Sequence, residues 1–324
     1  MQKSLKISNL ENNIHYQSRV MIPKDKAFKL IKIYMYVCEQ YDVNLYNYCQ
    51  RYSNNSVPVF SDQEILTIYL FVGSEQHYTK IKEIHNFAKD YLLEWFPKLV
   101  SYQTFNYRLN RMAGAVTEMS KQLLGSHKPE DCDEDTLLVD SLPIMTCTGR
   151  NRTGKVATEI ADKGYCSTKN QYYHGLKMHF VGMRRDGHLP FPYQIILSSA
   201  SENDLTVFKR ECVPSLGGKT IFADKIYRDN AYWKKENETK SNNLLTPIKG
   251  VKGATKEEKQ RNKAADDMFS SAVSSVREPV EAFFSWLIEK TNIQRAYKCR
   301  STAGLLVHVM GKVAIAFITL IFNY

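Results

Sequence analysis

The chain changes character at the acidic segment D-C-D-E-D, which occupies residues 131–135. Before this segment, apolar residues recur at helical spacing, and Ser61 and Glu64 form a capping box ahead of the apolar run ILTIYLFV. After it, short apolar runs alternate with turn residues, which is typical of strands. We therefore expect an all-α N-terminal domain over 1–130 and an α/β domain over 131–324.

The α/β domain is expected to hold a mixed sheet, because three consecutive strands precede an alternation of helices and strands. The five expected strands are 136–140, 175–183, 191–199, 219–224 and 242–249. The helices expected across the chain are 26–40, one that starts after Ser61, 79–95, 103–124, 204–213, 229–238, 272–293 and 304–322. The charged, glycine-containing stretch 249–268 is expected to form a loop.

The closing segment 304–322 is nearly all apolar and raises the question of a membrane span. His308, Lys312 and Thr319 fall on one face of a helix with this sequence, and the uninterrupted apolar run covers only 313–322. A run of that length is too short for a bilayer, which needs about 20 apolar residues. We expect a buried amphipathic helix there, and no membrane partner.

Charge and cysteine usage narrow the function classes. The chain carries 44 Lys and Arg against 34 Asp and Glu, and this net charge of +10 favours a polyanionic partner, either nucleic acid or an anionic membrane surface. The seven cysteines are widely spread without a C-x-x-C pair, which argues against a disulfide framework and a zinc knuckle. This usage fits a reducing cytosol, and the first residues lack the apolar core of a secretion signal, so a cytoplasmic protein is expected.

Two aspartates end apolar runs in the α/β domain. Asp140 closes LLVD, and Asp224 closes TIFAD 84 residues later. Ligands of open α/β sheets bind outside the carboxyl ends of the strands, so the two carboxylates meet if their strands are neighbours. Glu278 and Glu281 on the helix 272–293 offer a third carboxylate, and Glu281 is preferred because it lies beside the apolar stripe. A single strand-end aspartate is more often a turn or cap residue, so only the combination points to a site.

Neighbouring carboxylates repel each other, and cations allow them to stay ionised together. Carboxylate oxygens are hard ligands that suit Mg²⁺ or Mn²⁺. A pair of such ions about 3.5–4 Å apart promotes phosphodiester displacement, because one activates the attacking oxygen and the other stabilises the leaving oxygen. Asp140, Asp224 and Glu281 are therefore the candidate catalytic residues and the candidate ligands of two ions.

Three strings resemble the catalytic blocks of DDE-type insertion-sequence transposases: VDSLPI at 139–144, ADKIY at 223–227 and REPVEAFFSWL at 277–287. YYHGLKMHFV at 172–181 resembles the second-strand block of that family, and SENDL at 201–205 resembles the turn after its third strand. All five blocks stand in the order of the family. The similarity covers 135–324 well and 60–125 loosely.

The resemblance implies a catalytic domain of RNase H-like type, with a mixed five-stranded sheet and flanking helices, behind a helical domain that binds the ends of the element. It places the three metal-binding carboxylates on Asp140, Asp224 and Glu281. It implies that Arg277, four residues before Glu281, contacts a DNA phosphate or orients the glutamate. The implied activity is Mg²⁺-dependent cleavage of DNA at insertion-sequence ends, followed by strand transfer into target DNA. A homo-oligomer on the paired ends is expected from the resemblance alone.

Basic residues suggest where double-stranded DNA, as terminal inverted repeats and target, would bind. The stretch 150–185 mixes cations with tyrosines and is too polar for a core, although such runs are often plain surface. The helices near 79–95 and 103–124 could pair as a helix-turn-helix-like unit, or the second could be an ordinary amphipathic helix. Lys225 could neutralise a phosphate or be a surface lysine. The candidate DNA-binding residues are Arg277, Lys225, Arg150, Arg152, Lys163, Lys177, Asn106, Arg108 and Arg111.

Two other functions remain open at this point. One is a metal-dependent nuclease of the same fold, which cuts DNA without joining it. The other is a non-catalytic DNA-binding relative, against which the intact set of three carboxylates speaks. In each case the protein is expected in the cytoplasm, associated with the nucleoid when it is bound to DNA.

Overall fold

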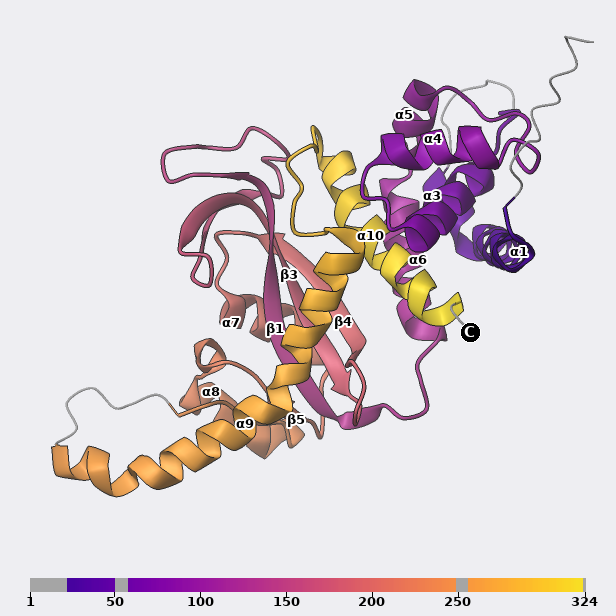
Figure 1. The fold of residues 1–324 in the computed structure, drawn as a ribbon. Coiled ribbons are helices and arrows are strands. Elements are labelled where there is room, and N and C mark those ends of the chain that lie inside the picture. Colours follow the sequence, from indigo (N-terminus) through magenta and orange to yellow (C-terminus); the bar gives the residue numbers. More distant parts are fainter. Residues whose placement is uncertain (1–21, 50–57, 249–255, 323–324) are drawn as a thin grey trace, which may run out of the picture.

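The computed structural model describes residues 22–49, 58–248 and 256–322, which form a helical region beside a sheet flanked by helices (Figure 1). The helical N-terminal region is present as predicted. Its α-helices are α1 (Lys24–Gln40), α2 (Tyr46–Cys49), α3 (Asp62–Gln76), α4 (Ile81–Tyr91), α5 (Tyr102–Arg111) and α6 (Ala113–Ser126). A π-helical turn, Tyr41–Leu45, joins α1 to α2.

Helix α3 is the centre of the helical region. The predicted capping box starts it, because Ser61 Oγ accepts a bond from the Glu64 amide at 3.2 Å and the Ser61 amide donates to Glu64 Oε2 at 2.5 Å. The following residues are buried on all sides, from Ile65 to Ser74, because α1, α4, α5 and the last helix of the chain pack around them. A helix that is apolar all round is typical of such a central position.

The described residues form one mixed sheet, as predicted, but it has six strands where five were expected. Its strands are β1 (Asp133–Thr148), β2 (Asp162–Cys166), β3 (Gln171–Arg184), β4 (Phe191–Ser199), β5 (Thr220–Phe222) and β6 (Asn243–Leu245). Antiparallel pairing joins β1 to β3 and β3 to both β2 and β4, whereas β1, β5 and β6 run parallel. Five strands match expected ones, and β2 is a strand that the sequence analysis did not predict.

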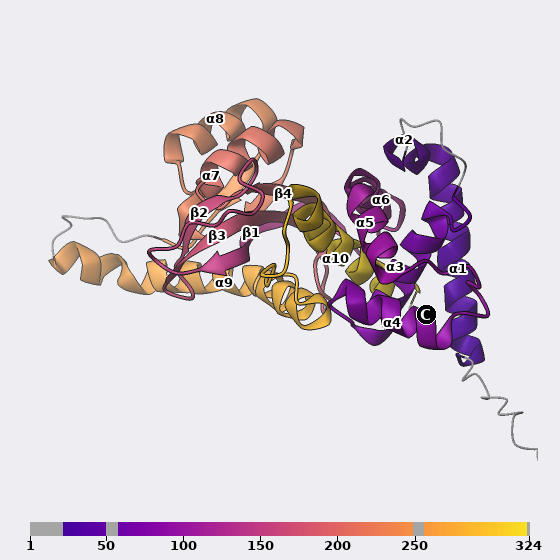
Figure 2. The same cartoon turned by 90° about the horizontal axis from the view of Figure 1, so that it is seen from above.

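Helices cover both faces of this sheet. The segment after β4 contains α7 (Asp204–Val207), the π-helical turn Phe208–Cys212 and two short 3₁₀ turns, Val213–Ser215 and Lys225–Tyr227, before α8 (Asn230–Lys240). Figure 2 shows α7 and α8 on one face and α9 (Lys256–Thr291) along the other. The rings of Phe180 on β3 and Phe283 on α9 stack at 4.5 Å between their centroids.

The expected loop 249–268 is wrong for most of its length. Residues 256–268 form the first turns of α9, because Lys, Glu, Gln, Arg and Ala dominate them and all favour helix. Residues 249–255 lie outside the described part of the chain.

The last helix, α10 (Thr302–Phe322), packs against α3 and α6. The approach is close, because a Cβ atom on Gly73 of α3 would collide with the side chain of Ile315. Ser120 Oγ on α6 also donates to the Met310 carbonyl at 2.7 Å. By length and composition α10 could cross a membrane, but most of it is buried here. The tail of the predicted catalytic domain thus packs on the helical region, and the division at residue 130 stays a prediction.

Candidate active site

Asp140 and Asp224 lie at the same level of two adjacent parallel strands. Leu138 on β1 pairs with Phe222 on β5. Asp140 lies two residues after Leu138, and Asp224 lies two residues after Phe222. The expected meeting of the two carboxylates thus follows from the register. The expectation that Asp140 ends its strand is wrong, because β1 stays paired with β3 after β5 has ended and continues to Thr148.

Helix α9 supplies the third carboxylate together with a cation. Arg277 Nη1 lies 2.9 Å from Asp140 Oδ2, and Arg277 Nη2 lies 2.9 Å from Glu281 Oε1. The side chain of Arg277 is 16% exposed and that of Asp140 is 26% exposed, whereas that of Glu281 is 61% exposed. The guanidinium therefore bridges a half-buried strand carboxylate and a helix carboxylate that reaches solvent.

Burial determines the electrostatics of Asp140. It raises the pKa of this carboxyl to about 6, against the lowering effect of the Ser141 amide, which donates at 2.8 Å, and of Arg277. The charges of Asp224 and Glu281 raise the pKa further, so both lie close enough for Asp140 to sense them. The site thus brings the charges of Asp224 and Glu281 within reach of Asp140, beside one arginine.

The donor set suits a divalent cation, because it consists of carboxylates that repel one another around a half-buried Asp140. In the arrangement described, however, no three Asp, Glu, His or Cys side chains among residues 22–49, 58–248 and 256–322 are grouped as ligands of one ion. The Arg277 guanidinium lies between Asp140 and Glu281 instead. A bound cation would neutralise the carboxylate charges that the guanidinium compensates in this arrangement.

A family model described as the transposase DDE domain matches residues 131–318. The chain belongs to the DDE-domain transposases. Neither a search of curated proteins nor a search of solved structures found a match. As a member of this family, the chain is in general terms a DNA-transposition enzyme. The family generally depends on divalent metal ions.

A second ion pair in the transposase, between Asp204 and Lys177, contacts Ser141, the residue that follows Asp140. Asp204 Oδ1 accepts from Lys177 Nζ at 2.8 Å, and Asp204 Oδ2 accepts from Ser141 Oγ at 3.1 Å. Lys177 also donates to the Glu202 carbonyl at 2.7 Å. The prediction that Lys177 contacts DNA is therefore revised, because its ammonium is used inside the protein. Sequence reasoning did not single out Asp204, and the SENDL resemblance was the signal that could have identified it.

Tyr227 is a further residue that sequence reasoning missed. Its side chain is 1% exposed, and burial raises its pKa well above the usual value, helped by the charges of Asp204 and Asp140. Its hydroxyl is buried without a hydrogen-bond partner in the described structure. The tyrosine closes the ADKIY string, three residues after Asp224, and only Asp224 and Lys225 of this string were taken as candidate site residues.

The other predicted DNA-binding residues of the α/β region lie in two places, one next to Asp224 and the other at the loop that follows β1. Lys225 is exposed immediately after Asp224. Arg150 and Arg152 are exposed in the loop that follows β1, and Lys163 on β2 donates to the Arg150 carbonyl. Thr148, where β1 ends, is at most about 26 Å from Asp140 along an extended strand. The loop cations thus follow the end of β1, which is eight residues beyond Asp140.

Arg108 is not on the surface of the transposase. Its Nη2 atom lies 2.5 Å from Asp62 Oδ1, its Nη1 atom donates to the Phe60 carbonyl at 2.5 Å, and it is only 9% exposed. The prediction that Arg108 binds DNA is therefore revised, because this side chain joins α5 to the start of α3. Asn106 and Arg111 on the same helix stay accessible, the first half-buried and the second exposed.

Proposed function

We propose that the chain catalyses Mg²⁺- or Mn²⁺-dependent cleavage of DNA at the ends of an insertion sequence and transfers the freed strands into target DNA. The observation that carries the proposal is that Arg277 bridges Asp140 and Glu281, with Asp224 just after the adjacent strand β5, in a domain of the DDE transposase family. The strand order, with β1 between β3 and β5, supports an RNase H-like type for the catalytic domain.

Asp140, Asp224 and Glu281 would hold two divalent ions. When bound, such ions activate the attacking oxygen and stabilise the leaving oxygen of an in-line displacement at phosphorus. Asp140 is held in place by the Ser141 amide and Arg277, and the Asp204–Lys177 pair fixes Ser141 from behind. This chain of contacts orients one carboxylate before any substrate arrives.

Arg277 has two uses in this proposal. Without ions it holds the charges of Asp140 and Glu281 together. Once cations neutralise these carboxylates, the guanidinium is free to bind a phosphate of the DNA strand, for which its planar set of donors is suited. Lys225, next to Asp224, is placed for a second phosphate contact, and the exposed Arg150 and Arg152 for more distant ones.

The remaining parts of the proposal rest on the family and on charge. The helical region before residue 131 would bind the terminal inverted repeats, and a homo-oligomer would hold two ends together. The net charge of +10 supports a DNA partner. A DNA-acting enzyme with this cysteine usage is proposed to work in the cytoplasm, on the nucleoid.

The test uses a DNA fragment that carries this gene with its native flanks. The fragment is incubated with purified protein in Mg²⁺ or in EDTA, and strand breaks and joined products are mapped. We expect Mg²⁺-dependent breaks at flanking inverted repeats and joining to a target plasmid, both absent with Glu281→Ala. Breaks without joining would instead support a nuclease, and a footprint without breaks would support a non-catalytic DNA-binding protein.

A further inference from the structure

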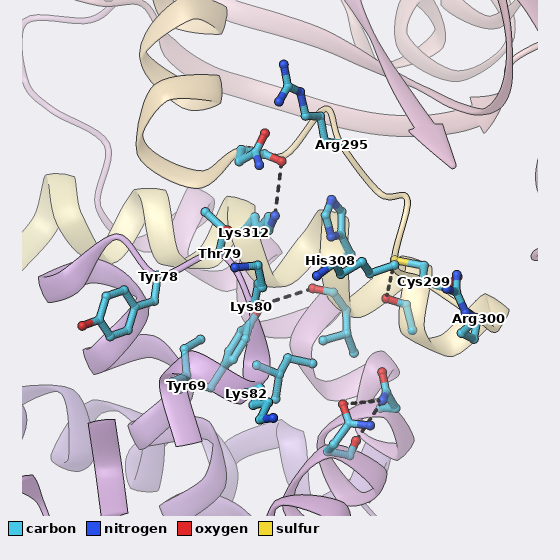
Figure 3. Close-up of a pocket in the computed structure, with 18 of the residues that line it drawn as sticks. Tyr69, Tyr78, Thr79, Lys80, Lys82, Arg295, Cys299, Arg300, His308 and Lys312 are labelled. Atoms are coloured by element: carbon cyan, nitrogen blue, oxygen red, sulfur yellow. Dashed lines mark hydrogen bonds between the residues drawn. The ribbon is translucent and has the colours of Figure 1, made fainter. Parts of the chain in front are cut away.

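A cavity of about 610 Å³ lies where the helical region meets the segment that joins α9 to α10 (Figure 3). Its walls come from Tyr69 on α3, from residues 78–80, from α4 and α5, from residues 292–301 and from one face of α10. This volume is in the range of small-molecule binding sites. The cavity is separate from the carboxylates, none of which lines it.

The lining of the cavity is cationic. Six of its side chains carry positive charge, and no Asp or Glu is among the described residues that line it. The six are Lys80, Lys82, Arg295, Lys298, Arg300 and Lys312. Lys80 pairs with Glu83, which lies outside the cavity. A concave surface with charge of one sign concentrates ligands of the opposite sign, so the cavity suits an anion.

Lys312 is the most unusual of these cations. It is 5% exposed, and its Nζ atom donates to the Asn292 carbonyl at 3.3 Å, with no carboxylate in contact among the described residues. Burial lowers the pKa of Lys312 to about 8. A buried ammonium without a carboxylate is costly, and an anion in the cavity would remove that cost. Lys312 interrupts a largely apolar stretch of α10.

Aromatic and amide side chains share the cavity with the cations. Tyr78, Tyr102 and Tyr297 line it together with Asn106 and Asn110. Rings of this kind stack on nucleobases, and asparagine amides hydrogen-bond to base edges. Cations beside tyrosines are the combination by which proteins hold a nucleic acid strand, with phosphate and base bound at once.

We propose that this cavity binds one nucleotide unit of a DNA strand, with its phosphate near Lys312 and Arg295 and its base against the tyrosines. This inference rests on the proposed function, since it assigns a second contact to the same DNA. Glu281 and Thr291, where α9 ends, are ten residues apart, or about 15 Å along the helix. That span corresponds to roughly four nucleotide steps of about 3.4 Å. Because the cavity lining begins at the next residue, Asn292, a strand that contacts Glu281 would need only a span of this order to reach the cavity.

The test measures DNA affinity by fluorescence anisotropy in EDTA, so that no cleavage occurs. The probes are a labelled single-stranded 20-mer and the same sequence as a duplex. Lys312→Met is compared with Lys235→Met, which removes a lysine exposed on α8, away from the cavity. We expect Lys312→Met to weaken binding about tenfold or more and to reduce the slope of log affinity against log salt by about one. Lys235→Met should change the affinity less than about twofold.

Arg295→Ala and Lys298→Ala are made as well, because both side chains are exposed and their loss leaves the core intact. We expect each to weaken binding, which keeps the test valid if Lys312→Met folds poorly. Free deoxyadenosine monophosphate is titrated as a competitor from micromolar to millimolar concentration. We expect weak competition, whereas displacement of the probe at micromolar concentration would mean that the cavity takes free nucleotides and would overturn the strand assignment.

The outcomes separate this inference from the proposed function. If the wild type binds and cleaves DNA but the three cavity variants bind it equally well, the cavity assignment is wrong and the function stands. If the wild type binds no DNA in either form, both are wrong.

Discussion

Arg277 Nη1 lies 2.9 Å from Asp140 Oδ2, and the same guanidinium reaches Glu281 at 2.9 Å. One arginine thus ties the central strand of the sheet to the helix that covers it, through two carboxylates proposed as metal ligands. Arg277 and Glu281 are four residues apart on α9, whereas Arg277 and Asp140 are 137 residues apart in the sequence. It indicates how the site stays assembled without an ion, because the guanidinium supplies part of the positive charge that the carboxylates need.

Replacing Arg277 should make stability depend on divalent ions. Arg277→Gln leaves Asp140 buried beside Asp224 and Glu281 without its cation, and we expect a loss of about 2 kcal/mol in the free energy of unfolding at pH 8. Added Mg²⁺ should restore more stability to the variant than to the wild type. Urea denaturation with and without Mg²⁺ measures this, with the exposed Arg228→Gln as control. Equal responses of variant and wild type to Mg²⁺ would contradict the proposed competition between guanidinium and cation.

Asp224→Asn should separate chemistry from binding. The substitution removes a proposed metal ligand at the end of β5 but no residue assigned to DNA contact. We expect cleavage of the flanking DNA to fall below detection while the affinity for that DNA, measured by gel shift, stays within about twofold. A parallel loss of binding and cleavage would argue against a metal-ligand role for Asp224.

Two arginines on α5 should behave in opposite ways. Arg108→Ala removes the buried partner of Asp62 and should cost about 3–5 kcal/mol of stability, with the DNA affinity of the folded protein unchanged. Arg111→Ala, on the exposed side of the same helix, should change stability by less than about 0.5 kcal/mol and weaken DNA binding. Thermal unfolding and anisotropy test the pair. Reduced DNA affinity in a stable Arg108→Ala protein would restore the original sequence-based prediction for that residue.

Lys312 should make stability depend on pH in the alkaline range. The pKa of Lys312 is about 8 in the folded protein, against an ordinary value of 10.5. Between these two pH values the unfolded chain therefore binds more protons than the folded protein does. The burial cost is therefore complete below pH 8 and is relieved as pH rises towards 10.5. We expect Lys312→Met to be more stable than the wild type at pH 7, by on the order of 3 kcal/mol.

This advantage should shrink as the pH rises to 9.5, because the wild-type lysine then loses its charge. His308 and Cys299 titrate near Lys312, so the difference between variant and wild type, and not either curve alone, isolates the lysine. Urea denaturation at both pH values measures it. A Lys312→Met protein that is less stable at pH 7 would show that the lysine contributes to stability.

Features that depend on neighbouring residues were predictable from the sequence. Ser61 and Glu64 carry the capping box within one turn, and the structure has both of its hydrogen bonds. The apolar runs before Asp140 and Asp224 indicated strands, and their equal spacing from those runs places the two carboxylates at one level. The family resemblance rested on the same short strings, and the family match over 131–318 confirms it.

Features that depend on distant partners were not predictable. The burial of Arg108 follows from Asp62, which lies 46 residues away, and the use of Lys177 follows from Asp204 across a strand pair. Strand β2 reads D-K-G-Y-C, which has no apolar alternation and becomes a strand by pairing with β3. Arg277 was considered for DNA or for Glu281, but its contact with Asp140 depends on where α9 crosses the sheet.

The measurement that tests the central claim most directly is Mn²⁺ binding, followed by the electron paramagnetic resonance signal of the free ion. Wild-type protein is titrated in the presence of duplex DNA beside Asp140→Asn, Asp224→Asn and Glu281→Gln, with Glu278→Gln as control on the exposed side of α9. We predict that the wild type and the control bind up to two ions and that each of the other three variants loses most of this binding. Equal Mn²⁺ binding by all five proteins would contradict the assignment of these three carboxylates as the metal site.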